Sequence, residues 1–558
     1  MNIKKILASN LDINFDVDFE SLITENQDKN MGDFSIACFS LAKILRKPPM
    51  QIANEIKENF PKIDFVEKIE CVNGYVNFFL NKEMLVKNVL SEIVRDAYIK
   101  KIEEPKTVCI DYSSVNLAKY MHIGHLSTTI IGESLARIYE ELGHKIVRIN
   151  YIGDYGTPFG KMIYAHQTWG SEKELDERGV DYLQDLYVEF CKRANDDPKL
   201  EESARECFKK ICDKDEQVYP LFQKFIEVSK VEAKRLLDIL DVHFDSWKGE
   251  SAYSDELDNV VELLTSKNLL IQSQGAKVVD LEKYDLGTCL IQKSDGTSLY
   301  ATRDICAAID RFNTYKFDKM IYVTAVQQKL HFQQFFKVLE LLGFDFSKNL
   351  QHVYYGMFSL PTGKIASRMG KQAVLVDLME IALNKVNAIV QERNFSDDKK
   401  REIAKKIAFS ALKFTPIKNE RIKDTVFDID TAFSFDGDTS AYLQYSYARI
   451  CSILRKAKEI SFDNIDFSYL NSESCANLVL MLNSFETNLN KAMEQNEPSI
   501  LCKYTLDICK MFNKFYNQEK VITDDVKSTQ AKLYLLTNIK KILTKLFHLI
   551  CIDTIEEM

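Results

Sequence analysis

The chain has 558 residues with 73 basic and 82 acidic side chains, which gives a formal net charge of −9, and 46% of its residues are hydrophobic. This composition excludes a disordered chain and argues weakly against a general nucleic-acid coat. The length exceeds what one compact core serves, so we expect roughly two to four domains, and the low proline and glycine content favours a helix-rich fold.

The first part of the chain, residues 1–84, has the pattern of a small α+β unit. Apolar residues at helical spacing predict a helix at 36–45, and the run at 74–80 reads as a strand. A linking helix is expected at 82–95, followed by a charged, proline-containing connector at 100–106. We therefore expect this unit to end before the main domain begins.

A strand and a helix flank residues 111–125, and this junction is the strongest functional signal in the chain. The run before it is β-rich, and apolar residues at helical spacing predict a helix at 130–142 after it. The free N–H groups and the dipole at such a helix start favour phosphate. His122 and His125 can donate hydrogen bonds to phosphate oxygens, and Gly124 lets a flat base approach the backbone. The sequence predicts a nucleotide site, with histidines that only cap the helix as the alternative.

Strand-like and helical runs alternate beyond this junction, as in βαβ units. Further strands are expected at 145–152, 318–326 and 350–358, with a helix at 330–342. This alternation predicts an α/β domain with a parallel sheet over 100–396. The stretch from about 163 to 277 has helical periodicity and much charge, so we expect a helical insertion that splits the sheet domain.

Strand signals nearly vanish after residue 396. Amphipathic helices are expected at 399–414, 441–460, 475–495 and 529–549. These helices predict an all-α helical bundle over 397–558. Positive charge is concentrated where this bundle begins, and it suits an RNA partner, although a solvated helix face would explain it as well. The cluster comprises Lys399, Lys400, Arg401, Lys405, Lys406, Lys413, Lys418, Arg421 and Lys423.

Several further stretches follow the junction in order along the chain. They are 150–156, 159–161, 294–304, 318–323, 327–332, 442–445 and 448–450. Together with 111–143 they resemble the class I aminoacyl-tRNA synthetases, and within that class the arginyl-tRNA synthetases, over nearly the whole chain. The resemblance implies a Rossmann-type catalytic domain, an N-terminal α+β additional domain and a C-terminal helical domain that binds the anticodon.

The implied reaction uses ATP to join L-arginine to its tRNA. The arginine carboxylate attacks the α-phosphate, which gives arginyl-adenylate and pyrophosphate, and the arginyl group then passes to the terminal ribose of the tRNA. Such a displacement needs cationic and N–H donors around the phosphates, and Mg²⁺ bound through ATP, rather than a protein nucleophile. The resemblance assigns catalysis to His122, His125, Lys119, Lys364 and Arg368. It assigns ATP binding to Ser114, His122, Gly124, His125, His331, Met357 and Lys364.

Arginine carries a guanidinium, a planar fork of five donors, so its pocket should supply carboxylates and carbonyl oxygens in one plane. By resemblance, the pocket residues are Asp111, Asn116, Tyr300, Asp304 and Gln328. Asp304 is the expected partner of the guanidinium, and Tyr300 shares its face if the segment is helical. For each acid, a helix cap or a surface ion pair is the structural alternative.

The expected second phosphate-binding loop, 363–371, departs from the class pattern K-M-S-K-S. Ile365 and Ala366 replace the methionine and the first serine. The residues that align are Lys364, Ser367 and Arg368. The second lysine of the pattern is absent, and in this family the lysine just before the histidine motif, here Lys119, is thought to reach the same phosphates. A flexible basic surface loop is the alternative.

Two regions are expected to contact tRNA. In the N-terminal unit, Asn77 and Phe79 are candidates for hydrogen bonding to and stacking on an unpaired base at the D-loop corner. As core residues of an alternating strand, they would need no such role. In the bundle the candidates are Tyr442, Tyr445, Tyr447 and Arg449. Aromatic and arginine side chains suit splayed bases, but aromatic residues at helical spacing are often core residues.

Two other functions fit part of the pattern. The altered loop is compatible with a non-catalytic paralogue that only binds tRNA, and the sheet class admits another class I adenylate-forming ligase. An acid directed at a guanidinium makes little sense for a neutral substrate, which disfavours the second reading. The scattered cysteines predict reduced thiols and no structural metal, and the lack of a signal peptide or apolar span predicts a cytoplasmic protein without membrane contact. A monomer is expected as well.

Overall fold

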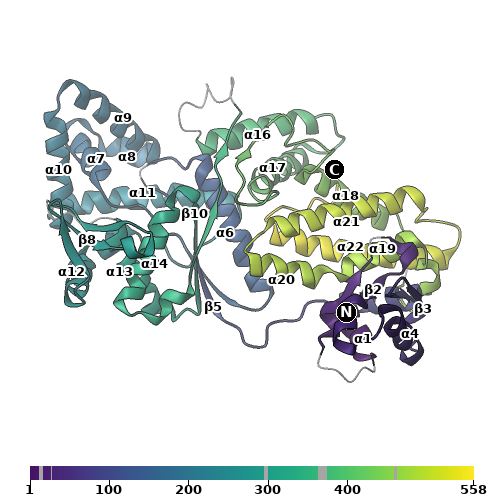
Figure 1. Ribbon diagram of the computed structural model, residues 1–558. Coiled ribbons are helices and arrows are strands. Elements are labelled where there is room, and N and C mark those ends of the chain that lie inside the picture. The colour runs from purple at the N-terminus through teal and green to yellow at the C-terminus, as the bar shows by residue number, and fades with distance from the viewer. Residues whose placement is uncertain (12–16, 27, 118, 295–299, 362–373, 458–460) are drawn as a thin grey trace.

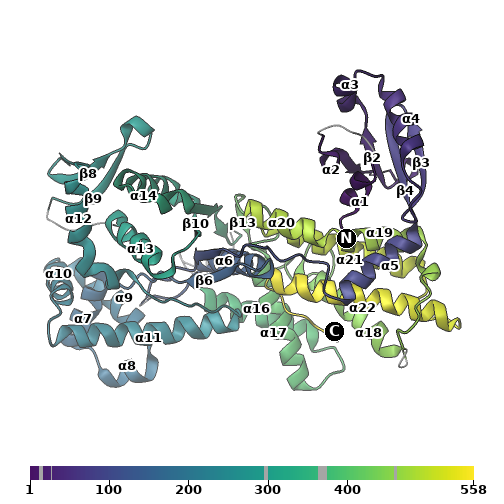
Figure 2. The same ribbon diagram turned by 90° about the horizontal axis from the view of Figure 1, so that it is seen from below.

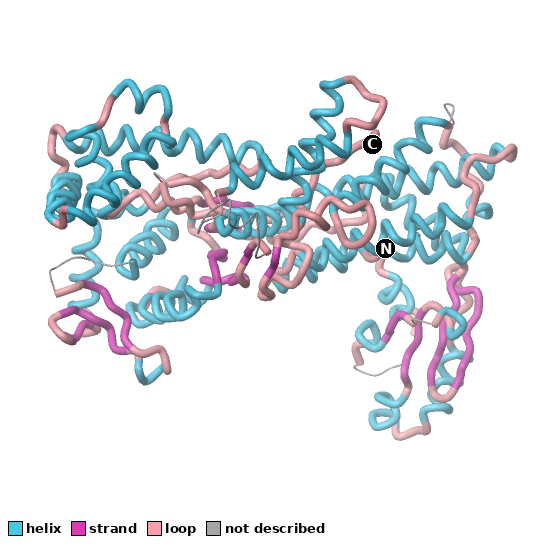
Figure 3. Tube along the Cα trace, turned by 90° about the horizontal axis from the view of Figure 1, so that it is seen from above, coloured by secondary structure: helices cyan, strands magenta, loops and turns pink. Residues whose placement is uncertain are grey.

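The computed structural model describes residues 1–11, 17–26, 28–117, 119–294, 300–361, 374–457 and 461–558 (Figure 1). A helical arm lies at one end of the molecule and a helical bundle at the other, with a parallel sheet between them (Figures 1 and 3). The N-terminal unit adjoins the bundle, far from the helical arm (Figure 2). Among the described residues, no helix combines the length and the apolar character needed to cross a membrane.

The N-terminal unit contains an antiparallel sheet in the order β1-β2-β4-β3. Its elements are α1 (Ile3–Ser9), α2 (Phe19–Leu22), β1 (Ile23–Glu25), η1 (Lys29–Met31), β2 (Phe34–Ala37), α3 (Phe39–Leu45), α4 (Pro49–Asn59), β3 (Val66–Val72) and β4 (Tyr75–Leu80). The predicted strand at 74–80 is confirmed. The predicted helix at 36–45 is wrong at its start, because Ile36 pairs with Ile23 and Val76 in the sheet.

The central sheet is parallel, with the strand order β11-β10-β5-β6, as the alternating pattern predicted. Its strands are β5 (Thr107–Asp111), β6 (Lys145–Ile149), β10 (Lys319–Ala325) and β11 (Leu350–Tyr355). The associated helices are α6 (Ile123–Glu141), α13 (Tyr300–Tyr315) and α14 (Lys329–Leu342), with η4 (Val326–Gln328) and η5 (Asp345–Asn349). Because the strands are parallel, their carboxyl ends, including Asp111, lie at one edge of the sheet.

The strand predicted at 350–358 is interrupted. Gly356 follows β11, and a Cβ there would lie 2.6 Å from the backbone of Lys423, so the chain passes closely against another segment at this point. Beyond it, β12 (Phe358–Ser359) pairs in parallel with β13 (Thr425–Val426). The chain thus leaves the central sheet at Gly356 and pairs with another segment.

The helical arm follows β6. It contains α7 (Thr157–Trp169), α8 (Glu172–Arg178), α9 (Val180–Asp196), α10 (Lys199–Cys212) and α11 (Val218–Ile239). Next come η2 (Glu250–Glu256), α12 (Leu257–Ser266), β7 (Leu270–Ser273), β8 (Ala276–Asp280), η3 (Glu282–Tyr284) and β9 (Thr288–Gln292). The antiparallel β7-β8-β9 sheet was not predicted, so the expected helical character does not extend to residue 277. Gln274 and Gly275, with φ of 51° and 80°, form the tight turn between β7 and β8.

The C-terminal part is helical. Its helices are α16 (Leu375–Val390), α17 (Asp397–Phe414), α18 (Ser440–Lys456), α19 (Glu473–Asn483), α20 (Phe485–Gln495), α21 (Ser499–Gln518) and α22 (Val526–Leu549), with η6 (Phe467–Leu470). The helix predicted at 475–495 is two helices, because Ser484 ends α19 and its hydroxyl donates to the Met481 carbonyl. The linking helix α5 (Lys82–Val94), predicted at 82–95, packs on α19 and α22.

Helix α6 lies between the central sheet and the bundle (Figures 1 and 2). It contacts β5, β6 and β10 on one side and α20 and α22 on the other, so every residue from His125 to Tyr139 is buried. Its amino end reaches the edge of the sheet where the strands end, which places the predicted nucleotide site there.

Candidate active site

The loop between β5 and α6 has an unusual backbone. Ser113 and Ser114 have left-handed conformations, with φ of 70° and 47°, which residues other than glycine adopt only where contacts enforce them. Two threonines of α6 provide such contacts. The Ser113 N–H donates to Thr128 Oγ1 at 3.2 Å, and Thr129 Oγ1 lies 2.9 Å from Ser113 Oγ. The helix therefore fixes the conformation of the loop that precedes it.

The two histidines cap the start of α6. His122 is the N-cap residue, and its Nδ1 accepts from the Gly124 N–H at 3.1 Å. His125 Nδ1 accepts from the His122 N–H, also at 3.1 Å. Helix capping was the alternative to a nucleotide site for these histidines. The capping geometry does not exclude phosphate binding. Because each Nδ1 is an acceptor, the neutral ring carries its proton on Nε2, which stays a donor.

Burial keeps both imidazoles neutral. It lowers the pKa of His122, and it lowers the pKa of His125 to about 3, with His122 adding to that second shift. The two rings stack with their centroids 3.9 Å apart. Two neutral Nε2–H donors therefore lie together at the positive end of a helix dipole, where they fit phosphate oxygens.

Gly124 leaves no room for a side chain between the histidines. A Cβ there would lie 2.9 Å from His122 Cε1 and 3.0 Å from His122 Nδ1, so another residue would displace the imidazole from its capping position. The Gly124 carbonyl also accepts from the Tyr355 hydroxyl at the end of β11, at 3.5 Å. Glycine is thus required for ring placement, in addition to the base approach expected from the sequence.

Asp111 is paired with a buried arginine. Its Oδ2 lies 2.8 Å from NH2 of Arg311 on α13, and Ser114 Oγ lies 3.3 Å from its Oδ1. Burial raises the pKa of Asp111, and Arg311 opposes that shift. The carboxylate that the resemblance directs to the substrate therefore already has an internal guanidinium partner, and the pair joins β5 to α13.

Asp304 and His331 form the contact between the two predicted substrate sites. Asp304 Oδ2 accepts from His331 Nε2 at 2.6 Å, so a residue predicted for arginine touches one predicted for ATP. Tyr300 precedes Asp304 by one helical turn on α13, as predicted, and its side chain is 66% exposed. Gln328 is exposed immediately before α14, the helix that carries His331. The four side chains lie where α13 and α14 begin.

Glu250 is a further candidate site residue that no sequence motif reveals. It begins η2, and Asp154 fixes this turn by accepting from the N–H and the hydroxyl of Ser251 at 2.8 and 2.7 Å. Burial raises the pKa of Glu250 to about 7; Arg303, whose NH1 is 3.7 Å away, opposes the shift, and Asp304 adds to it. A second carboxyl is therefore coupled electrostatically to Asp304, an arrangement that suits a guanidinium.

The polar groups near these carboxyls include two that are buried without a hydrogen-bond partner among the described residues. They are the hydroxyl of Tyr151 and Nε of Arg303. The charges of Asp304 and Glu250 reach Tyr151 and, with burial as the larger cause, raise its pKa. Buried polar groups are costly unless another group completes their hydrogen bonds. These two groups thus have hydrogen-bonding capacity left for a polar ligand.

The helical arm contacts the loop before the histidines. Lys119 Nζ lies 5.1 Å from the centroid of the Tyr187 ring on α9, and the Tyr120 hydroxyl donates to Asp181 Oδ1 at 2.8 Å. Asn116, earlier in the same loop, is exposed. The arm therefore influences where the predicted phosphate-binding lysine lies.

The predicted second phosphate loop, 363–371, lies outside the described residues, and Lys364 and Arg368 lie there with it. Met357, shortly before it, is 51% exposed after the end of β11. Its N–H donates to Asp424 Oδ1 at 2.7 Å, and its sulfur lies 2.7 Å from Nε2 of Gln327. Met357 is thus at the same edge of the sheet as the histidine motif.

The predicted tRNA contacts of the N-terminal unit lie on β4. Asn77 is 2% exposed, and its Nδ2 has no hydrogen-bond partner among the described residues. Phe79 is half-buried, with Lys68 Nζ 4.0 Å from its ring centroid. Asn77 lies in the core of the unit here, so the expected contact with a base stays a prediction.

A groove of about 320 Å³ adjoins α18 and the last residues of the chain. Tyr445 and Arg449 line it together with Tyr516, and the Arg449 guanidinium lies 4.8 and 5.3 Å from the two ring centroids. Tyr442 is half-buried and Tyr447 is buried. Tyr445 and Arg449 are therefore the members of the predicted set that line the groove.

The basic cluster at the start of the bundle is partly engaged in internal contacts. Buried Lys413 Nζ lies 3.0 Å from Asp553 Oδ2, and Arg421 Nε donates to the Asn496 carbonyl at 3.1 Å. Arg401 pairs with an acid on its own helix. Lys413 and Arg421 therefore hold the bundle together internally and are not part of a free basic surface, whereas the exposed Arg401 pair leaves its surface accessible.

Known proteins match the chain over its full length. Residues 85–429 match the family model described as "tRNA synthetases class I (R), catalytic domain", residues 443–558 the "DALR anticodon binding domain" and residues 1–80 the "Arginyl tRNA synthetase N terminal domain". An arginine–tRNA ligase of Clostridioides difficile is 41% identical over 97% of this chain and 96% of its own. One of Clostridium perfringens is 41% identical over 100% of both chains. The structure of Thermus thermophilus arginyl-tRNA synthetase superposes with a TM-score of 0.81 at 25% identity, covering 100% of this chain and 99% of that one.

Proposed function

The chain belongs to the arginyl-tRNA synthetase family of class I, and we infer on this premise that it is an arginine–tRNA ligase. It activates L-arginine with ATP to arginyl-adenylate and pyrophosphate, and then transfers the arginyl group to tRNA with release of AMP. The observation that carries the site assignment is the stacked pair of neutral imidazoles at the start of α6, His122 and His125.

We propose that these histidines stabilise the charge that moves onto pyrophosphate in the activation step. Their Nε2–H groups are aligned before the reaction, so no reorganisation is needed when the α-phosphate is attacked. Lys119, Lys364 and Arg368 are proposed to add positive charge around the phosphates. The remaining ATP contacts in the proposal are Ser114, Gly124, His331 and Met357. Mg²⁺ bound through ATP would neutralise further phosphate charge.

The arginine pocket is proposed to centre on Asp304. The coupling of Asp304 with Glu250 supports a two-carboxyl recognition of the guanidinium, and Tyr300, Asn116 and Gln328 are proposed to complete the pocket with Asp111. Citrulline would leave a buried carboxylate without its charged partner, and lysine could not satisfy a planar array of acceptors, so both should be rejected.

The tRNA is proposed to lie along the bundle and the N-terminal unit that adjoins it. Tyr445 and Arg449 are proposed for unpaired anticodon bases, with Tyr442 behind them, and the N-terminal unit, at Asn77 and Phe79, for the D-loop corner. Action as a monomer in the cytoplasm is part of the same proposal. Sedimentation of the protein with and without tRNA tests the monomer.

The assay that tests the proposal is arginine-dependent exchange of pyrophosphate into ATP, run with and without the cognate tRNA. We expect exchange with arginine, and no exchange with citrulline or lysine at equal concentration. When total tRNA is offered each of the twenty labelled amino acids in turn, only arginine should become attached to tRNA. A protein that binds tRNA but supports neither reaction would be a non-catalytic paralogue, and exchange with a neutral amino acid would indicate another ligase of this class.

A further inference from the structure

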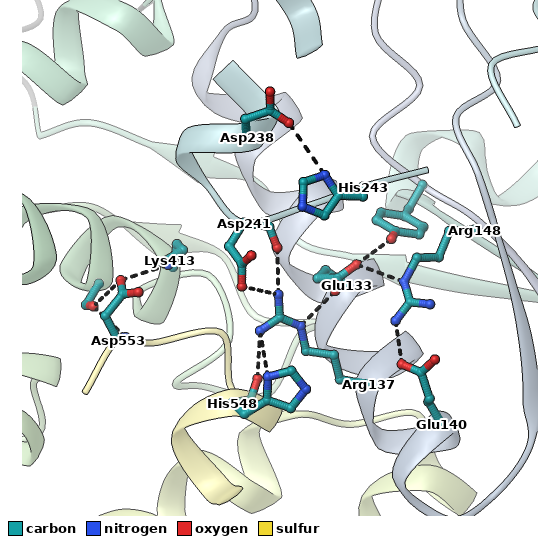
Figure 4. Close-up of polar contacts among 12 residues, drawn as sticks. Glu133, Arg137, Glu140, Arg148, Asp238, Asp241, His243, Lys413, His548 and Asp553 are labelled. Carbon is teal, nitrogen blue, oxygen red and sulfur yellow. Dashed lines mark hydrogen bonds and ion pairs between the residues drawn. The ribbon is translucent and has the colours of Figure 1, made fainter. Parts of the chain in front are cut away.

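Arg137, on the carboxyl half of α6, joins three remote segments of the chain. Its Nε donates to Glu133 Oε1 on the same helix at 2.7 Å, and its NH2 donates to the carbonyl and to Oδ2 of Asp241, at 2.6 and 2.9 Å. Its NH1 donates to the His548 carbonyl at 3.0 Å (Figure 4). The side chain is 6% exposed, so one buried guanidinium connects α6, the end of the helical arm and the end of α22.

The contact with α22 is a cap made by another helix. His548 and Leu549 are the last two residues of α22, where the carbonyls run out of helical partners. The His548 carbonyl accepts from the Cys551 N–H at 3.1 Å, and Arg137 adds a second donor to it. The Leu549 carbonyl accepts from the Ser134 hydroxyl at 2.7 Å, next to the bond between Arg137 and the His548 carbonyl. The guanidinium also places positive charge at the negative end of the α22 dipole. The end of α22 is therefore fixed directly to α6.

Glu133 extends the connection to the active-site loop. Its Oε2 accepts from the Tyr112 hydroxyl at 2.6 Å and lies 3.3 Å from Arg148 Nε. Tyr112 is fully buried, and it is the residue directly before the left-handed Ser113. A Cβ at Gly132 would lie 2.2 Å from the Tyr112 ring, so the ring is in close contact with α6. A displacement of Arg137 would thus be transmitted to the loop through the Glu133 carboxylate and the Tyr112 ring.

At its other side, α22 contacts the helix that carries the accessible candidates for anticodon binding. The Tyr447 hydroxyl on α18 lies 2.9 Å from Thr544 Oγ1 on α22, one turn before His548. Tyr445 and Arg449 flank Tyr447 on α18. The contacts therefore form a continuous path from the proposed anticodon surface through α18 and α22 to Arg137, Glu133 and the loop.

We propose that Arg137 is a positioning residue for the ligase reaction. It couples the binding of tRNA to the bundle with the conformation of the nucleotide loop. It touches no substrate and acts through Glu133 and Tyr112. The inference rests on the proposed ligase function and tRNA surface, yet different results would overturn the function and the coupling. Wild-type protein without charging activity overturns the function, whereas an active enzyme with insensitive variants overturns only the coupling.

Two substitutions interrupt the path at different points. Arg137→Lys keeps a buried positive charge that can pair with Glu133, but it removes the fork that also reaches His548 and Asp241. Tyr112→Phe removes only the hydroxyl that binds Glu133 and leaves all contacts between the bundle and α6 in place. Lys545→Ala is the matched control, because it breaks another α6–α22 ion pair, 2.9 Å long to Glu141, that does not involve Glu133.

The readouts are kcat for charging, the dissociation constant for tRNA, and the ratio of kcat between cognate tRNA and a transcript with an altered anticodon. We expect Arg137→Lys and Tyr112→Phe each to lower kcat roughly tenfold while the affinity for tRNA changes by less than about twofold. The anticodon-dependent ratio should fall toward one in both variants. Lys545→Ala should leave kcat and the ratio within about twofold of wild type.

A double-substitution cycle separates coupling from simple loss of stability. If Arg137 acts through Tyr112, the Arg137→Lys/Tyr112→Phe protein should be no slower than the slower single variant, whereas Tyr112→Phe and Lys545→Ala should be additive. An unaltered kcat in Tyr112→Phe would overturn the proposal. So would a wild-type kcat that does not depend on the anticodon, or a fall in kcat that follows the unfolded fraction measured by thermal denaturation.

Discussion

The proposed nucleotide site and the proposed arginine pocket lie beside each other but are assembled differently. The histidine pair is held by hydrogen bonds between residues two and three positions apart, within one stretch of chain. The acidic pocket draws Asp304 from α13, His331 from α14 and Glu250 from η2, which are distant in sequence. A local site depends on the backbone that carries it, whereas the assembled pocket depends on how several elements pack.

The largest expected effect tests the local site, by His122→Asn. Asparagine is a good N-cap, so the start of α6 should survive, but the Nε2–H donor is lost. We expect kcat for arginine-dependent pyrophosphate exchange to fall about 100- to 1,000-fold at saturating ATP, with little change in the unfolding midpoint. His243→Asn, at an imidazole 72% exposed on the surface, is the control. An unchanged kcat in His122→Asn would mean that the histidine only caps the helix.

The next effect tests whether the loop needs its close packing on α6. Gly132→Ala gains up to about 1 kcal/mol of helix propensity, but its Cβ would lie 2.2 Å from the Tyr112 ring. Overpacking of this severity costs more than the gain, so we expect a net loss of about 2 kcal/mol in the free energy of unfolding. Denaturation with urea measures it. A stabilised protein would show that Tyr112 can move without cost.

This difference in assembly decides how much of the site could be predicted from sequence. The placement of His122 and His125 at the start of α6 follows from a strand, a turn and a helix start, all of which are local patterns. Asp304 was found only through the matched stretch around it. Glu250 and Arg311 were missed, because nothing near either residue in the sequence indicates that folding brings it to the carboxyl edge of the sheet.

The same distinction holds for the fold. The parallel strands were predicted because buried strands are continuous apolar runs, and α6 because its apolar residues recur at helical spacing. The β7-β8-β9 sheet was missed, since short, half-exposed strands carry weak signals and only the Gln274-Gly275 turn marks them. Ile36 fits a helical and a strand period equally. It is in a strand because it pairs with neighbouring strands that are distant in sequence.

A smaller effect tests the assembled pocket, by His331→Asn. His331 donates to Asp304 Oδ2, which orients the carboxylate and leaves Oδ1 for a substrate. If that is its main role, KM for arginine should rise about tenfold while KM for ATP stays within about twofold. The opposite split would place His331 at ATP, as the resemblance predicts. Steady-state kinetics with each substrate varied in turn distinguishes the two.

The smallest effect concerns the ionisation of Glu250, whose pKa burial raises to about 7 from an ordinary value of 4.5. The folded protein favours the neutral carboxyl of Glu250. The contribution of this carboxyl to the free energy of unfolding is therefore complete below pH 4.5 and is lost as the pH rises through 7. Arginine binding should have the opposite sign, since the guanidinium favours the carboxylate. His125, with a pKa of about 3, stays neutral over this range and does not contribute.

We therefore expect KM for arginine to fall by at most about tenfold between pH 6 and pH 8, because the ionised fraction of Glu250 rises about tenfold over that interval. Glu250→Gln should raise KM at pH 8 and flatten the profile, while KM for ATP should follow the same weak pH dependence in both proteins. A Glu250→Gln profile as steep as that of wild type would assign the titration to another group. It would also remove Glu250 from the pocket and leave Asp304 as the sole carboxyl partner of the guanidinium.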